Sequence, residues 1–112
     1  MDQLRVVDPL GARRLIDDGA VLLDVRTSEE WAAGRASGAV HIPLFELPDR
    51  LDELVGASAV VCVCRTGVRA RRAALFLLEN GVSAVNLDGG MDAWVAAGAP
   101  VEAGSGDAGA TT

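Results

Sequence analysis

The stretch VVCVCRTGVRARRAA, residues 60–74, decides the fold class of this chain. It opens with β-branched residues and cysteine and with no charge, which is typical of a strand buried on both faces. A short segment with glycine and arginine follows, and a helix is predicted from Arg69 to Asn80. The stretch therefore predicts a buried strand joined by a tight loop to a helix, with Cys64 at the junction.

The same alternation runs along the whole chain of 112 residues, half of which are apolar. The predicted strands are Arg5–Val7, Ala20–Val25, Gly38–Leu44, Ala59–Val63 and Ala84–Leu87, and the predicted helices lie at 9–19, 27–34, 47–56, 69–80 and 91–98. This order predicts one α/β domain over residues 1–101, in which a parallel sheet is covered on both faces to give three α/β/α layers. The glycine-rich remainder, residues 102–112, is predicted to be disordered.

Charge excludes several classes of function. The formal net charge is -6, so the protein as a whole is not expected to bind nucleic acid or an anionic membrane. All ten basic residues are arginine, which removes Schiff-base chemistry and a P-loop lysine from consideration. Four of the ten nevertheless follow Cys64 within eight positions, at Arg65, Arg69, Arg71 and Arg72. The last two lie further into the predicted helix, where a solvated face explains them at least as well as a site.

The loop CRTGVR, residues 64–69, has the composition of an anion-binding site. It leads from the carboxyl end of a strand, where parallel sheets bind ligands, to a helix N-terminus with its unpaired N–H groups and positive dipole. Gly67 lets the backbone curl so that amides point inward, and Arg65 and Arg69 add positive charge. These features favour the thiolate of Cys64, a nucleophile placed to attack a negatively charged molecule. The alternative is an inert core thiol beside a solvated helix face.

Three ordered segments of the chain resemble the rhodanese-homology domain. LLDVRTSEEWAAGRASGAVHIPL (22–44) is similar to its N-terminal signature, VVCVCRTGVRARRAALFLLENG (60–81) to its active-site segment, and VNLDGGMDAWVAAGAPV (85–101) to its C-terminal signature. The resemblance extends from Val6 to Val101. It implies a five-stranded parallel sheet flanked by helices, and a cysteine that becomes a persulfide and passes on sulfane sulfur.

The resemblance also implies a mechanism. The Cys64 thiolate would attack the outer sulfur of thiosulfate or a similar small anionic donor, and a thiol such as thioredoxin or glutathione, or cyanide, would then accept the sulfur. The substrate-binding residues implied are Arg65, Thr66, Gly67, Val68 and Arg69. No metal or organic cofactor is needed. The expected protein is a cytoplasmic monomer without a membrane segment.

Two other functions stay open. Phosphatases and arsenate reductases of this fold use a C-x5-R loop, whereas the spacing from Cys64 to Arg69 is C-x4-R and the next position is Ala70. The shorter loop argues against that chemistry. A partner-docking module without activity is the third reading, although inactive relatives typically lack the cysteine. Ala70 and Val68 replace more polar residues of the family, which puts donor preference and rate in question.

Several further residues have a supporting or structural interpretation. Asp24 and Arg26 are expected to orient the loop, or to pair with Glu30, and Arg35 either adds positive charge at the site mouth or is a surface residue. Cys62 lies two residues from Cys64 on the same strand, which is poor geometry for a disulfide, so it is interpreted as a buried thiol rather than a resolving one. The remaining candidates are interpreted as structural: His41 as a turn support, Trp31 and Trp94 as core anchors, and Gly89 and Gly90 as a turn.

Overall fold

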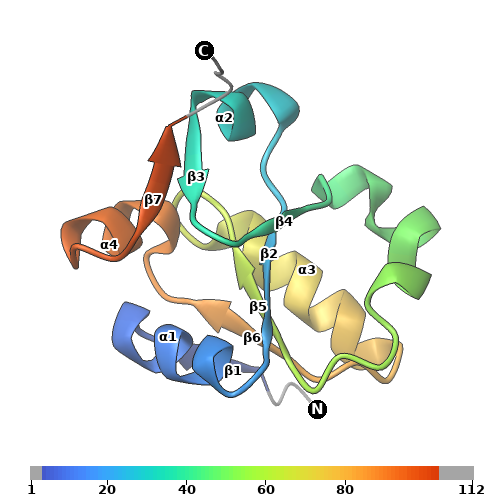
Figure 1. The fold of residues 1–112 in the computed structure, drawn as a ribbon. Coiled ribbons are helices and arrows are strands. Elements are labelled where there is room, and N and C mark those ends of the chain that lie inside the picture. Colours follow the sequence, from blue (N-terminus) through green and yellow to red (C-terminus); the bar gives the residue numbers. More distant parts are fainter. Residues whose placement is uncertain (1–3, 104–112) are drawn as a thin grey trace.

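The computed structural model describes residues 4–103, and its centre is a parallel sheet (Figure 1). Five strands lie in the order β1-β6-β5-β2-β4. Their bounds are β1 Arg5–Val7, β2 Val21–Asp24, β4 Val40–His41, β5 Val60–Val63 and β6 Ala84–Leu87. The predicted five-stranded parallel sheet is confirmed, and its central strand β5 is the one that ends at the candidate loop.

Helices cover both faces of this sheet. They are α1 (Pro9–Asp17), α2 (Ser28–Ala33), α3 (Val68–Glu79) and α4 (Gly90–Ala96), together with the 3-10 segment η1 (Leu44–Glu53). Figure 1 shows α1 and α4 on one side of the sheet and α3 and η1 on the other. The three-layer α/β/α arrangement is therefore confirmed. Among residues 4–103, no helix is both long and apolar enough to cross a membrane.

The alternating side chains of β5 divide the core into two layers. Val60 and Cys62 pack toward α3 and η1, with Cys64 continuing on the same side, whereas Val61 and Val63 pack toward α1 and α4. All four strand residues are fully buried. Burial on both faces explains why this segment carries no polar position, as expected for a central parallel strand.

Local capping explains where the first two helices begin. The Asp8 carboxylate accepts the Gly11 amide at 2.8 Å, and Pro9 occupies the first turn of α1. In α2, Thr27 and Glu30 form a reciprocal capping box. Both caps join residues three positions apart, and the second one fixes the orientation of Glu30.

The structure differs from the predictions in three places. The segment predicted as a helix over 47–56 is the 3-10 helix η1, whose interior holds Pro48 and a non-helical Arg50 with φ -122°. Pro48 lies inside the segment that begins at Leu44, where proline has no N–H to donate and its ring crowds the preceding turn, and this disfavours a regular α-helix starting at Leu44. The strand predicted over 38–44 shortens to β4, next to Pro43. A two-stranded antiparallel sheet of β3 (Gly34–Ala36) and β7 (Val101–Ala103) was not predicted.

The pairing of β3 with β7 also corrects part of the prediction for the tail. Glu102 and Ala103 belong to β7, with Arg35 opposite Glu102 and Gly34 opposite Ala103. These two residues were predicted to be disordered because their composition is small and polar, a signal that contains no information about a pairing partner far away in the sequence. The rest of the predicted tail, 104–112, lies outside the described residues.

Replacing Gly90 by alanine is expected to lower the free energy of unfolding by about 3–5 kcal/mol. A Cβ there would collide with the carbonyl oxygen of Cys64 and lie 2.6 Å from that of Arg65, and Gly90 has φ +56°. Gly98→Ala is the matched control, since Gly98 also has a positive φ, +74°, but no atom within 4 Å of the added Cβ. It should cost only about 1 kcal/mol. Equal losses in urea unfolding would contradict close packing of α4 on the loop.

Candidate active site

The sulfur of Cys64 occupies the N-terminus of α3. Its Sγ accepts the Gly67 amide at 3.1 Å and the Ala70 amide at 3.3 Å. Gly67 is the N-cap residue with φ +118°, and it has no side chain to cap the helix. Cys64, three residues before Gly67, therefore caps the helix instead. Its sulfur accepts N–H groups that a helix otherwise leaves unpaired. The same donors stabilise negative charge on the sulfur.

Backbone hydrogen bonds attach the loop to α4. The Cys64 carbonyl accepts the Met91 amide at 2.7 Å, and the Arg65 carbonyl accepts the Asp92 amide at 3.2 Å. Both donors lie in the first turn of α4, directly after Gly90. The predicted turn at Gly89 and Gly90 thus brings α4 against the loop that carries the candidate nucleophile.

Asn86 is a site residue that sequence reasoning missed. It stands in the otherwise apolar strand β6, beside Cys62, and its Nδ2 donates to the Gly67 carbonyl at 3.2 Å. Its Oδ1 is buried and has no hydrogen-bond partner among the described residues. A buried amide that binds the carbonyl of the N-cap residue fixes the peptide plane between Gly67 and Val68, at the start of α3. The signal that could have identified it is one polar residue in the buried strand AVNL.

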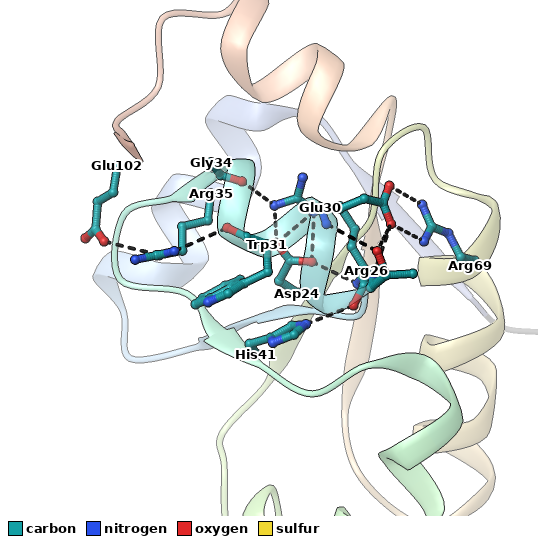
Figure 2. Close-up of polar contacts among 10 residues, drawn as sticks. Asp24, Arg26, Glu30, Trp31, Gly34, Arg35, His41, Arg69 and Glu102 are labelled. Atoms are coloured by element: carbon teal, nitrogen blue, oxygen red, sulfur yellow. Dashed lines mark hydrogen bonds and ion pairs between the residues drawn. The ribbon is translucent and has the colours of Figure 1, made fainter. Parts of the chain in front are cut away.

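Arg69 is bound by a carboxylate. Its guanidinium donates to Glu30 Oε1 at 2.6 Å and to Oε2 at 3.0 Å, which joins α3 to α2 (Figure 2). Hydrogen bonding to Arg69, aided by the hydrogen bonds of Thr27, lowers the pKa of Glu30 to about 2. Arg69 was predicted as an anion ligand. The structure shows a charge already compensated by its bidentate partner, a pairing that no spacing rule reveals because the two residues are 39 positions apart.

Asp24 and Arg26 form a second, buried ion pair. Arg26 donates to both carboxylate oxygens at 2.8–3.0 Å and to the Gly34 carbonyl at 2.7 Å. Glu30 was one predicted partner of Arg26. That partner is wrong, since Asp24 lies two residues away on the same strand end and Arg69 takes Glu30. The pair ties the end of β2 to the start of β3.

His41 and Arg35 lie against the two sides of Trp31 (Figure 2). The His41 ring stacks on Trp31 with centroids 4.6 Å apart, and its Nε2 is 2.8 Å from the Arg26 carbonyl. This agrees with a structural role. The Arg35 guanidinium lies 4.7 Å from the Trp31 ring centroid and 3.5 Å from Glu102. Trp31 is therefore half-buried between two side chains rather than a core anchor.

Arg35 is a residue of β3 and pairs with Glu102 of β7, and Figure 2 shows it on the opposite side of the Asp24–Arg26 pair from Arg69. The other predicted loop residues, Arg65, Thr66 and Val68, have exposed side chains. Among residues 4–103, no group of three or more histidine, cysteine or acidic side chains is arranged to hold a metal ion.

Cys62 is the second thiol near the loop. Both thiols are free and buried. Burial, with a smaller contribution from the neighbouring Cys64, raises the pKa of Cys62 to about 12. Its thiol therefore stays protonated at neutral pH and is a poor nucleophile.

Replacing Glu30 by glutamine is expected to lower the free energy of unfolding by about 1 kcal/mol at pH 7. The folded-state pKa of Glu30, about 2, lies below its ordinary value of 4.5, so the stabilisation is present above about pH 4.5 and disappears as the pH falls toward 2. The difference between wild type and variant should narrow over that range. Glu29→Gln is the matched control, because it removes the same charge from an exposed neighbour. Equal effects of the two substitutions at pH 7 would contradict the Glu30–Arg69 pair.

Comparison with known proteins agrees with this geometry. The family model described as the rhodanese-like domain matches residues 9–97. The chain is 38% identical over 94 residues to a protein named sulfurtransferase from Allochromatium vinosum, covering 82% of this chain and 88% of that protein. It is 32% identical over 95 residues to thiosulfate sulfurtransferase GlpE from Pseudomonas fluorescens, covering 84% and 87%.

A solved structure and a longer relative complete the comparison. The rhodanese-related protein from Thermoplasma volcanium superposes with a TM-score of 0.80 at 28% identity, covering 88% of this chain and 97% of that one. The chain is also 43% identical over 86 residues to an HTH-type transcriptional regulator from Mycobacterium tuberculosis; the match covers 75% of this chain but only 38% of that protein. With its sheet order, its cysteine-bearing loop and these matches, the chain belongs to the rhodanese-like domain family.

Proposed function

We propose that this chain is a sulfurtransferase that carries sulfane sulfur as a persulfide on Cys64. The observation that carries the proposal is the pair of amides, from Gly67 and Ala70, that donate to Cys64 Sγ at the positive end of α3. Sulfur at this position is stabilised as an anion and is supplied with donors before any substrate binds. The relatives named sulfurtransferase, among them GlpE thiosulfate sulfurtransferases, support the same reaction class.

The proposed reaction has two steps. In the first, the Cys64 thiolate attacks the outer sulfur of thiosulfate, the S–S bond of the donor breaks, and sulfite leaves with the bonding electron pair. In the second, a thiol attacks the outer sulfur of the Cys64 persulfide. The acceptor leaves as a persulfide, and the Cys64 thiolate is restored. This is ping-pong covalent catalysis, in which the loop amides stabilise the anionic sulfur on both sides of each step.

The loop side chains are proposed to have different roles in binding the donor. Arg65, Thr66 and Val68 are exposed at the mouth of the loop, so Arg65 is the cation proposed to attract the anionic donor. Arg69 is proposed to hold α3 against α2 through Glu30, and thereby to fix the amide of Ala70, the next residue. Asp24 and Arg26 are proposed to support this arrangement by fixing the end of β2.

The acceptor is proposed to be a thiol of the thioredoxin or glutathione class. Two free cysteines and a persulfide intermediate suit a reducing compartment, and we propose the cytoplasm. The proposed working unit is a monomer, because β5, the strand that carries Cys64, and the loop after it belong to one compact domain.

Intact mass tests the proposal directly. The reduced protein mixed with thiosulfate should gain one sulfur, about 32 Da, and Cys64→Ser should gain none. Cys62→Ala is the matched control and should still gain the sulfur, because Cys62 is buried with a raised pKa. A gain that persists in Cys64→Ser, or no gain in the parent protein with thiosulfate or a persulfide donor, would contradict the proposal.

A further inference from the structure

The four backbone amides at the start of α3 form two pairs. The outer pair, from Gly67 and Ala70, donates to Cys64 Sγ at 3.1 and 3.3 Å. The inner pair, from Val68 and Arg69, has no hydrogen-bond acceptor among residues 4–103. A helix leaves such groups to a cap, a ligand or water. The start of α3 therefore holds two N–H donors, between those that contact the sulfur, that the thiol of Cys64 does not use.

The direction of the Val68 N–H is set by the carbonyl of Gly67. The two groups belong to one planar, trans peptide unit, so they point in opposite directions. The Gly67 carbonyl accepts the Arg71 amide of α3 at 2.9 Å and Asn86 Nδ2 of β6 at 3.2 Å. The Val68 N–H therefore points away from both donors, toward the end of the helix that Cys64 caps.

Asn86 is the side chain that restrains this peptide unit. Gly67 has φ +118° and no Cβ, so its backbone reaches conformations that other residues avoid. Rotation of the peptide unit between Gly67 and Val68 would turn the carbonyl oxygen toward the sulfur and the N–H away from it. The Arg71 amide bond is that of any first helical turn, whereas Asn86 holds the carbonyl from a different element. An amide faces a carbonyl oxygen with its nitrogen, which places the Oδ1 of Asn86 on the far side.

This contact is unfavourable for the stability of the strand that provides it. Asn86 is 7% exposed, and the other residues of β6 are apolar. Its Oδ1 is buried and has no hydrogen-bond partner in the part of the chain that the structure describes. Burial of an unpaired polar atom is unfavourable, and an apolar side chain of similar size would avoid the loss. Stability alone therefore does not explain an asparagine at this position.

We infer that Asn86 is a positioning residue for sulfur transfer, which directs the Val68 N–H at the sulfur that Cys64 receives. The inference rests on the proposed function and adds a residue to it. When the Cys64 thiolate attacks thiosulfate, the new S–S bond forms, the S–S bond of the donor breaks, and sulfite leaves with the electron pair. The negative charge then lies on the outer sulfur of the persulfide, one atom beyond the Sγ that Gly67 and Ala70 contact. The Val68 N–H is a donor still available to that atom.

The test measures single-turnover sulfur transfer from thiosulfate and urea unfolding on the same variants. Asn86→Leu removes the amide and keeps a side chain of similar size. It should slow the gain of sulfur, followed by rapid-quench intact mass, about tenfold, because a donor that is no longer directed stabilises the charge less. Its urea midpoint should equal or exceed that of wild type, since the unpaired Oδ1 is gone. Asn86→Ala, which introduces no new contact, should slow the transfer equally.

The amide of Val68 gives a second readout, which a purely structural role of Asn86 would not move. Its proton and nitrogen-15 chemical shifts should change when wild type takes up sulfur. They should change less in Asn86→Leu at equal sulfur content. Equal changes in the two proteins overturn the inference, because the Val68 N–H would then reach the sulfur without Asn86.

Val85→Ala is the matched control for a change in the same strand. Val85 is buried in β6 but belongs to the other core layer, with residues of α1 and α4. Its truncation should lower the urea midpoint and leave the transfer rate unchanged. Asn86 variants that transfer sulfur at the wild-type rate, or an equal slowing in Val85→Ala, overturn the inference. If wild type gains the sulfur in that case, the proposed function survives, whereas absence of a gain in wild type overturns both.

Discussion

The arrangement on which the rest of the structure depends is the meeting of one sulfur atom with two backbone amides. Cys64 Sγ stands where a serine or aspartate oxygen caps other helices, and it receives the N–H groups of Gly67 and Ala70. The two amides cap α3, and they are also the donors available to negative charge on the sulfur. The same contacts therefore serve the start of the helix and the proposed nucleophile.

Other contacts serve to keep that arrangement in place. Asn86 holds the Gly67 carbonyl from β6, the first turn of α4 holds the carbonyls of Cys64 and Arg65, and Glu30 holds Arg69 from α2. Each contact comes from a different element of the fold. The loop thus has little freedom to rearrange when a substrate arrives, which is the condition for preorganised stabilisation of developing charge.

The division of charge at the site has a consequence for specificity. Arg69 carries the charge expected of an anion ligand, but its bidentate partner Glu30 removes most of its attraction for a donor. Arg65 and the amides remain for an anionic group, and the side facing Val25 and Phe45 is hydrocarbon.

Much of this followed from the sequence because the signals were local. The buried strand at 60–63 and the glycine at position 67 each specify their structure within a few residues. The β3–β7 sheet, the Glu30–Arg69 pair and the role of Asn86 connect residues distant in the chain. Sequence periodicity does not identify partners that lie far apart in the chain. For η1, the non-helical backbone at Arg50 interrupts the helix that the sequence pattern predicted over 47–56.

Whether Cys64 holds the transferred sulfur between the two amides is tested by observing those amides. Nitrogen-15 chemical shifts of the backbone would be recorded before and after the reduced protein is treated with thiosulfate. If Cys64 accepts sulfur in its cradle, the largest changes should fall on the amides of Gly67 and Ala70, and Cys64→Ser should show neither. Unchanged shifts of the Gly67 and Ala70 amides in a protein that has gained a sulfur would show that the transferred sulfur does not lie against these two amides.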